Sequence, residues 1–270
     1  AVLNQAKQKG AKGDGFDQVE SRLANVAKDE GGQTDEGTLE KAVVLRDSGK
    51  YDEAINLLLS EIIRAPKDPN IPAVLSHCYL LIDNLEKAKA FLNAAKNINP
   101  STPLVGWNAV RILLKEQKVN EALDIAYKTN KLFPDDVEGM DVLGLCLRAS
   151  GNFDESLKYL DNAIKLNPNY SEALINRGIV YLNKKDKANA LADLEKAHKL
   201  KPHIKEIWDF IIALYAEENR YEEAIKCLVN MIEIDPSHPK SLALLVQCNQ
   251  KADDTKLAIM SFQRVLEVVQ

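Results

Sequence analysis

The sequence predicts an all-α fold, an α-solenoid of stacked helix hairpins, and three periodic features carry this prediction. Six of the ten prolines lie 34 residues apart without a break: Pro66, Pro100, Pro134, Pro168, Pro202 and Pro236. A small residue lies twelve positions before each of them and again one period later: Ala54, Ala88, Ala122, Ser156, Ala190, Ala224 and Ala258. Each period also holds two runs of apolar residues at helical spacing. A fixed period of this length is the signature of a repeat architecture.

The elements follow in order from this period. With the proline at place 32, the repeats cover residues 35–68, 69–102, 103–136, 137–170, 171–204, 205–238 and 239–270. In each repeat a first helix is expected before a polar break near place 15, such as Ser48-Gly49-Lys50, and a second helix after it. The proline ends the second helix, because it has no N–H for the helical ladder and disfavours α geometry in the preceding residue. The small residue at place 20 lets the two helices of a hairpin approach closely.

These residues resemble the tetratricopeptide repeat, most closely in the fourth and fifth repeats, "MDVLGLCLRASGNFDESLKYLDNAIKLNP" and "LINRGIVYLNKKDKANALADLEKAHKLKP". The resemblance covers about 236 of the 270 residues. It implies a right-handed superhelix in which the first helix of each hairpin lines the concave surface, with stability carried by contacts between neighbouring repeats. The chain departs from the family pattern at place 8 (Val110, Ile212, Val246) and at place 27 (Glu61, Thr129, Met231), which predicts locally wider helix contacts.

Residues 1–34 do not follow the period and contain five of the chain's twelve glycines, which predicts a flexible leader. Within this leader, Phe16, Val19, Leu23 and Val26 recur at helical spacing, so a short amphipathic helix is expected over about residues 14–29. Three alternatives stay open for this helix. It caps the first repeat, it lies as a pseudo-ligand in the concave groove of its own or a neighbouring molecule, or it is disordered.

The last predicted helix, about residues 256–269, ends in apolar residues with no polar capping helix behind it. A following repeat, another domain or a dimer partner is expected to bury Val265, Leu266, Val268 and Val269. The alternative is that these side chains are simply tolerated in solvent.

The composition argues against several classes of function. With 35 basic and 40 acidic residues the net charge is −5, so no nucleic-acid partner is predicted. No apolar stretch is long enough to span a bilayer. Cys78, Cys146 and Cys248 share place 10, where other repeats carry apolar residues, and reduced core thiols favour a cytoplasmic protein. No histidine or cysteine has metal-ligand spacing and no phosphate-binding loop or catalytic constellation is found, so neither an enzyme nor a cofactor is predicted.

The resemblance implies that places 2, 5, 6, 9, 12 and 13 of the first helices face the groove. The candidate partner-binding residues at these places are Val74, His77, Leu81, Trp107, Asn108, Arg111, Asp141, Leu145, Arg148, Asn176, Ile179 and Phe210. Trp107 and Phe210 are not needed for the hairpin core, and an exposed aromatic beside Arg and Asn is typical of a binding hot spot. The alternative is that superhelical curvature hides these side chains between neighbouring first helices.

Two specialised binding sites of the family are not matched. The carboxylate clamp that binds acidic chaperone tails requires basic and amide residues where this chain has Asp141 and Leu145. The asparagine ladder that grips a peptide backbone is represented only by Asn108 and Asn176.

The sequence therefore predicts a non-enzymatic scaffold that binds a partner peptide or helix in its concave groove. One alternative is the substrate-recruiting region of a larger enzyme, such as a glycosyl-, sulfo- or methyltransferase. The other is a scaffold that self-associates through the leader or the last helix. Partner identity does not follow from the fold.

Overall fold

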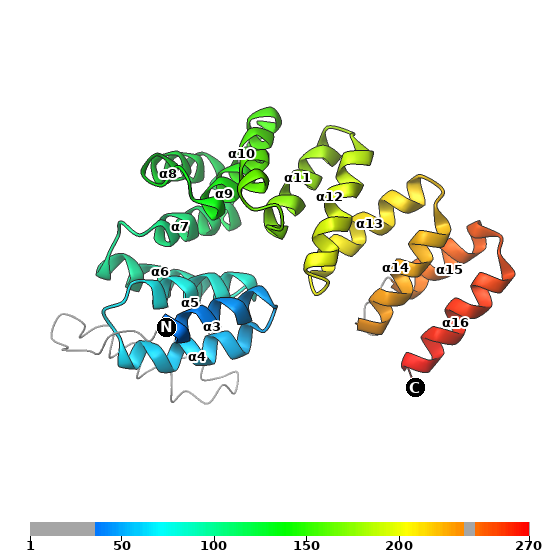
Figure 1. Ribbon diagram of the computed structural model, residues 1–270, viewed down its shortest axis with the longest axis horizontal. Helices are drawn as coiled ribbons and strands as arrows, with labels where there is room; N and C mark the ends of the chain where they lie inside the picture. Colours follow the sequence, from blue (N-terminus) through cyan, green and yellow to red (C-terminus); the bar gives the residue numbers. More distant parts are fainter. Residues whose placement is uncertain (1–35, 235–240, 270) are drawn as a thin grey trace. The chain divides into compact units, whose positions relative to one another are not determined.

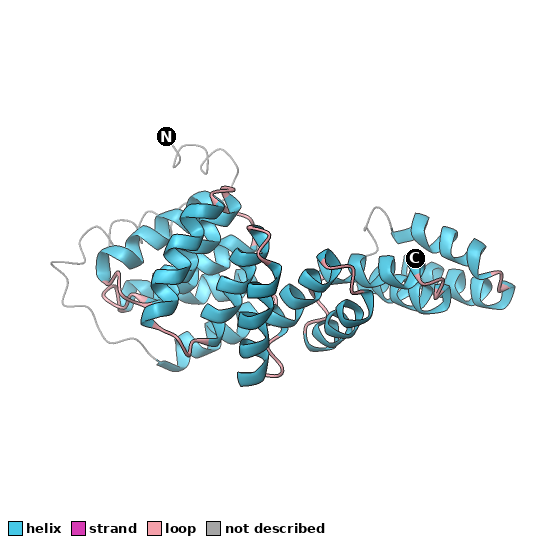
Figure 2. Cartoon of the chain, turned by 90° about the horizontal axis from the view of Figure 1, so that it is seen from above, coloured by secondary structure: helices cyan, strands magenta, loops and turns pink. Residues whose placement is uncertain are grey.

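The computed structural model describes residues 36–234 and 241–269, and all fourteen regular elements in this part of the chain are α-helices joined by short loops (Figures 1 and 2). The predicted all-α fold of helix hairpins is therefore confirmed. Within these ranges no helix is both long and apolar enough to cross a membrane. The predicted leader helix over residues 14–29 lies outside the described residues, as do the side chains of Val268 and Val269.

The helices form two compact units, which divide between Asn152 and Phe153. The first unit contains α3 (Glu36–Asp47), α4 (Tyr51–Arg64), α5 (Asn70–Leu81), α6 (Leu85–Ile98), α7 (Pro103–Lys115), α8 (Val119–Leu132) and α9 (Val137–Ala149). The second contains α10 (Phe153–Leu166), α11 (Ser171–Asn183), α12 (Lys187–Leu200), α13 (Lys205–Glu217), α14 (Tyr221–Ile234), α15 (Ser241–Ala252) and α16 (Thr255–Val269). The division falls inside the fourth predicted repeat, so the repeat region predicted over 35–270 consists of two compact units.

The small residue at place 20 lies where the two helices of a hairpin meet. Its side chain is fully buried at Ala54, Ala88 and Ala122 in the first unit and at Ala190 and Ala224 in the second. Around it, each unit buries a continuous apolar core, with Leu58, Leu75 and Phe91 in the first unit and Leu194, Ile207 and Leu228 in the second. Because there is almost no side chain at place 20, apolar residues on both sides of it can interdigitate.

Each first helix ends in the same way, at the residue in place 15. Backbone φ is positive there in all seven hairpins, at Gly49, Asp83, Gln117, Gly151, Lys185, Asn219 and Asp253. In six of the seven, the next N–H donates to the carbonyl five residues back, as from Lys118 N to Leu113 O at 2.9 Å and from Asn152 N to Leu147 O at 2.9 Å. A left-handed residue followed by an N–H that donates to the carbonyl five residues back is the Schellman motif at the C-terminus of a helix. It turns the chain toward the second helix at a fixed point of every period.

Opposite substitutions at place 15 should change stability in opposite directions. At Gly151, where φ is +82° and an added Cβ would meet nothing within 4 Å, Gly151→Ala should cost about 1 kcal/mol through backbone strain alone. At Gln117, where φ is 62° and the residue is exposed, Gln117→Gly should stabilise by up to about 1 kcal/mol because it removes the same strain. Urea unfolding followed by circular dichroism measures both changes. Shifts of the same sign would contradict this explanation of the turn.

Candidate functional site

Trp107, predicted to be an exposed anchor, is fully buried, so the prediction of its exposure is wrong. Its indole Nε1 donates to Asp136 Oδ2 at 2.6 Å, while Asp136 Oδ1 accepts from the backbone N–H of Glu138 at the start of α9. The ring lies against Gly139, where an added Cβ would come within 2.3 Å of it. Trp107 therefore fills the seam between α7 and α9, which pack side by side.

Three other predicted groove residues in the first unit are buried as well: Val74, Asn108 and Asp141. Asn108 Nδ2 donates to the carbonyl oxygen of Ala73 at 2.7 Å and so ties α7 to α5. The predicted exposure of these residues is also wrong, because neighbouring first helices in this unit are in direct contact. Side chains at places 5 and 6 are then enclosed between helices, as the alternative interpretation of the sequence expected.

His77 and Arg111 belong to a partly buried polar ladder, which we define as Arg46, His77, Arg111 and Glu138, from α3, α5, α7 and α9. Arg46 Nη1 donates to His77 Nδ1 at 3.2 Å, and Arg111 Nη2 lies 2.9 Å from Glu138 Oε1. His77 Nδ1 lies 3.8 Å from the same carboxylate oxygen. Burial lowers the pKa of Arg46, but the carboxylates of Asp47 and Glu138 outweigh it, and the net shift of this pKa is upward. The ladder thus links four successive first helices through charge-assisted contacts.

The remaining predicted residues are more accessible. Leu81 is exposed, and Leu145 and Arg148 are half-buried on α9. Arg148 Nε has no hydrogen-bond partner among the described residues, and burial lowers the pKa of this guanidinium, with Asp141 opposing the shift.

In the second unit, Asn176 and Ile179 are half-buried on α11, and Phe210 on α13 is 37% exposed. Only Leu81 and Phe210 among the twelve predicted residues therefore present a largely solvent-exposed apolar side chain.

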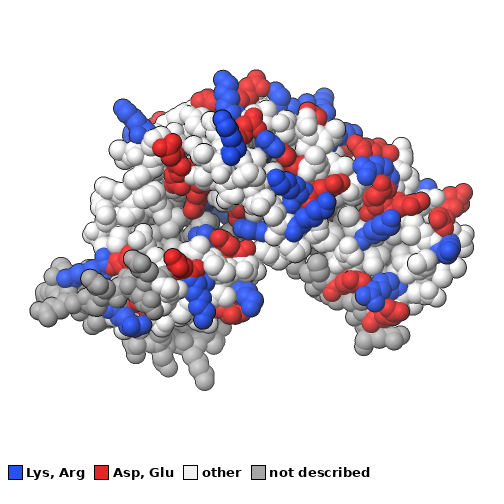
Figure 3. All heavy atoms as spheres, in the orientation of Figure 1, with Lys and Arg blue, Asp and Glu red and all other residues white. Residues whose placement is uncertain are grey.

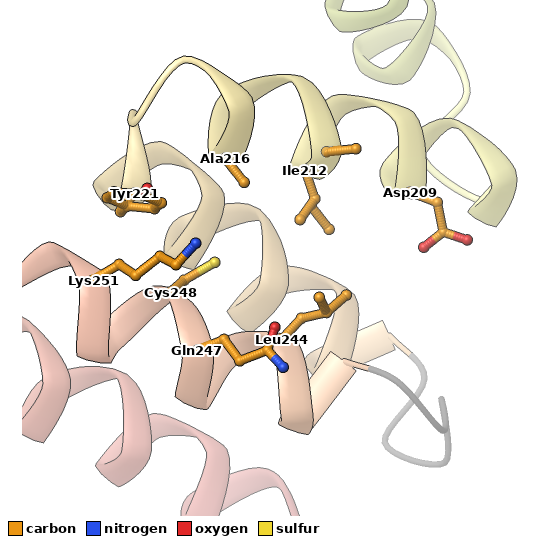
Figure 4. A pocket seen from close by; sticks show the side chains of 9 residues that line it. Asp209, Ile212, Ala216, Tyr221, Leu244, Gln247, Cys248 and Lys251 are labelled. Atoms are coloured by element: carbon orange, nitrogen blue, oxygen red, sulfur yellow. The ribbon is translucent and has the colours of Figure 1, made fainter.

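A cleft of ≈ 320 Å³ opens between α13 and α15 in the second unit (Figure 4). Both helices pack on α14 but barely contact each other. The lining residues are Asp209, Ile212, Ala213, Ala216, Tyr221, Leu244, Gln247, Cys248 and Lys251. The contrast with the first unit lies at place 5, where Asp209 is exposed instead of filling the seam as Trp107 does. The side chain at place 5 thus leaves the space between α13 and α15 unfilled.

The cleft has an apolar wall and a charge at each end. Ile212, Ala213 and Leu244 form part of the wall, whereas Asp209 and Lys251 lie at opposite ends (Figure 4). The ammonium of Lys251 is 5.8 Å from the centroid of the Tyr221 ring. An apolar recess with a few convergent polar groups is the usual composition of a binding site.

The cysteines lack the properties of catalytic thiols. Burial raises the pKa of Cys78, Cys146 and Cys227 to about 11 each, so these thiols stay protonated at neutral pH. Burial also raises the pKa of Cys248, the thiol in the cleft. All four cysteines are free, and the three at place 10, Cys78, Cys146 and Cys248, are buried, whereas Cys227 is half-buried. In the described part of the chain no three or more His, Cys, Asp or Glu side chains are arranged to hold a metal ion.

Charges of both signs alternate over the face shown in Figure 3, and no broad area of one sign is visible on it. Many of these charges are paired at the surface, as in the contact of Lys184 with Asp154 at 2.6 Å and of Lys187 with Glu217 at 2.7 Å. Exposed pairs of this kind contribute little to stability.

The residues that line the cleft were not among the predicted site residues, although several of them occupy groove-facing places in the 34-residue period. Asp209 and Ala213 occupy places 5 and 9, and Leu244, Gln247 and Lys251 occupy places 6, 9 and 13 of the last repeat. All of these are groove-facing places in the period. What the sequence did not reveal is which seams between first helices close and which stay open.

The fold defines a class of all-α solenoids built from helix hairpins, and comparison with known families agrees with it. Three family models, each described as tetratricopeptide repeat, match residues 45–106, 142–203 and 213–238, together more than half of the chain. The chain belongs to the tetratricopeptide repeat family.

Curated relatives of this chain include a DnaJ homolog and a subunit of the anaphase-promoting complex. The DnaJ homolog subfamily C member 7 homolog of Dictyostelium discoideum is 19% identical over 243 residues, which cover 80% of this chain and 45% of that protein. Anaphase-promoting complex subunit 3 of Schizosaccharomyces pombe is 21% identical over 228 residues, covering 84% of this chain and 34% of that protein. The chain thus spans less than half the length of either relative.

Among solved structures, a thermophilic tetratricopeptide repeat protein of Thermus thermophilus matches with a TM-score of 0.56 and 25% identity. The match covers 68% of this chain and 98% of that one. The family and these relatives support a general role in protein–protein interaction.

Glu138→Gln should destabilise the first unit by roughly 1–2 kcal/mol, because it leaves the partly buried Arg111 without its carboxylate and removes a nearby negative charge from Arg46, whose own ion pair is with Asp47. The loss should be visible as a lower urea midpoint by circular dichroism. Lys115→Gln is the control, since it breaks an exposed pair with Asp83 in the same unit without changing a residue at place 15, and it should leave the midpoint unchanged. Equal effects of the two variants would show that the ladder is not a stabilising contact.

Proposed function

We propose that the chain is a non-enzymatic interaction scaffold that binds a partner peptide or helix in the cleft between α13 and α15. The observation that carries the proposal is the cleft itself, an open apolar seam between two first helices. Neighbouring first helices in the first unit are in direct contact instead. The protonated state of the buried cysteines supports a non-catalytic role.

The size of the cleft suits an apolar anchor. A volume of ≈ 320 Å³ is at the lower end of ligand pockets and accommodates one or two large apolar side chains. Ala213 and Ala216 have small side chains and leave space on the α13 side of the cleft. A partner side chain such as Leu, Met or Phe would therefore reach Ile212 and Leu244. Burying such a side chain is worth roughly 1.5–3 kcal/mol before the costs of association.

The charges at the two ends of the cleft indicate which partner residues would flank the apolar side chain. Asp209 would pair with a basic residue of the partner and Lys251 with an acidic one. The length of the cleft can be taken along α13, where Ala216 lies toward the Lys251 end (Figure 4). Asp209 and Ala216 are seven residues apart on α13, about 10 Å along the helix axis. That distance corresponds to roughly three residues of an extended peptide or about seven of a helical one. The partner motif is therefore a basic and an acidic residue at one of these spacings with an apolar residue between them.

Other first-helix residues of the second unit extend this surface. We include Asn176, Ile179 and Phe210 as further contacts of the partner, because each retains solvent exposure on α11 or α13. Trp107, Asn108 and the other buried residues of the first unit are not part of the proposed site.

A library of random peptides displayed on phage tests this motif. Selection on the intact chain should enrich peptides with an apolar residue between a basic and an acidic one, at the spacing given above. The consensus peptide, made with a fluorescent label, then serves as the probe for anisotropy titrations against variants.

Ala216→Phe should fill the cleft and weaken binding of this probe by at least about tenfold. Lys251→Glu should weaken it similarly, and a probe whose acidic residue is replaced by Lys should recover affinity for this variant. The matched control is Ala192→Phe, the same change at an exposed site on α12 in the same unit, which should leave the affinity unchanged. If Ala216→Phe binds the probe as well as the intact chain does, the cleft is not the binding site.

A further inference from the structure

The last hairpin exposes apolar side chains at places that the preceding hairpin buries. In the repeat that starts at residue 205, places 4, 8, 21 and 28 hold Trp208, Ile212, Ile225 and Ile232, with exposures of 2%, 3%, 1% and 0%. In the last repeat the same places hold Leu242, Val246, Ile259 and Leu266, with exposures of 42%, 41%, 54% and 59%. We call these four residues of α15 and α16 the end face.

The end face is distinct from the cleft. The cleft is lined from α15 by Leu244, Gln247, Cys248 and Lys251, whereas Leu242 and Val246 lie on another side of the same helix. α16 packs on α14 more extensively than on α15. Asn249 and Ser261, buried and hydrogen-bonded at 3.0 Å, join α15 and α16 on the inner side. The outer side of this hairpin is left without apolar cover among the described residues.

The charges of α16 indicate what covers the end face. Helices α4, α6, α8 and α10 each carry an acidic residue in the first turn and a basic one in the last, which complements the helix dipole. α16 has neither. Asp254 caps it from outside, accepting from Leu257 N at 3.0 Å, but within the helix a lysine, Lys256, comes first and a glutamate, Glu267, comes last. Arg264 offsets this order only in part, by pairing with Glu267 at 2.9 Å within α16, and an antiparallel copy of the same helix would place Lys256 near Glu267 as well.

We propose that the end face binds the end face of a second copy of this chain, with the two α16 helices antiparallel across a two-fold axis. Such an isologous contact uses the same patch on both molecules. Aligning Ile259 with Leu266 of the other copy brings Lys256 within two residues, about 3 Å along the helix axis, of Glu267 on that copy. Each copy thus supplies both the apolar centre and one half of two ion pairs.

Sedimentation equilibrium of the intact chain over roughly a hundredfold range of concentration measures this association. The mass should rise toward twice 30.1 kDa with concentration. Leu266→Asp should hold the mass at that of one chain, while circular dichroism shows unchanged helicity. Leu166→Asp is the control, since this leucine on α10 is similarly exposed at 56%, and it should associate like the intact chain.

A charge exchange tests the antiparallel arrangement independently of the apolar contact. Lys256→Glu alone and Glu267→Lys alone should each weaken association at least about threefold, whereas the double variant should restore most of it. This design separates the end face from the cleft, because neither residue lines the cleft and the labelled peptide should bind all three variants equally.

A constant mass of one chain at all concentrations would overturn the proposal. So would association that Leu266→Asp does not affect, or single charge variants that the double variant fails to rescue. If a chain lacking residues 1–34 associates while the intact chain does not, the leader covers the end face, and the proposed second copy is wrong as the native occupant.

Discussion

The close approach of the two helices within five of the hairpins constrains the elements around it, because it occurs at a residue with almost no side chain. Ala54, Ala88 and Ala122 are fully buried at this contact in the first unit, as are Ala190 and Ala224 in the second. A larger residue there would separate the helices and displace the apolar residues around them. With the contact in place, the left-handed residue five positions earlier turns the chain, and the hairpin presents one face to the next repeat.

Neighbouring first helices then either close against each other or stay apart, and this determines which seams between repeats are open. In the first unit Trp107 fills the seam between α7 and α9, and Asn108 ties α7 to α5. The polar ladder adds a charged link across the same helices. In the second unit Asp209 takes the place equivalent to Trp107 and is exposed, and a cleft lies between α13 and α15. One repeat pattern is therefore compatible with closed seams in one unit and an open seam in the other.

The period made the fold predictable, since proline, alanine and apolar stripes each act through local geometry that recurs every 34 residues. It also identified the groove-facing places, including those of Asp209 and Ala213. It did not reveal that Trp107 is buried, because burial at place 5 depends on Gly139 of the next repeat, which admits the ring, and on Asp136 at the end of the same repeat, which accepts its N–H. Such contacts depend on the particular pair of residues that meet between repeats, and a position within one repeat does not specify its neighbour.

α15 shows how a solenoid helix serves more than one contact. Its buried side packs on α14, one exposed side lines the cleft with Leu244 and Lys251, and another carries Leu242 and Val246. In an internal repeat, contacts with both neighbours would occupy such surfaces, since repeat stability is the sum of hairpin and neighbour interfaces. Because the two exposed sides use different residues, a peptide in the cleft and a second chain on the end face do not compete for the same side chains. Substitutions in one surface therefore report on that surface alone.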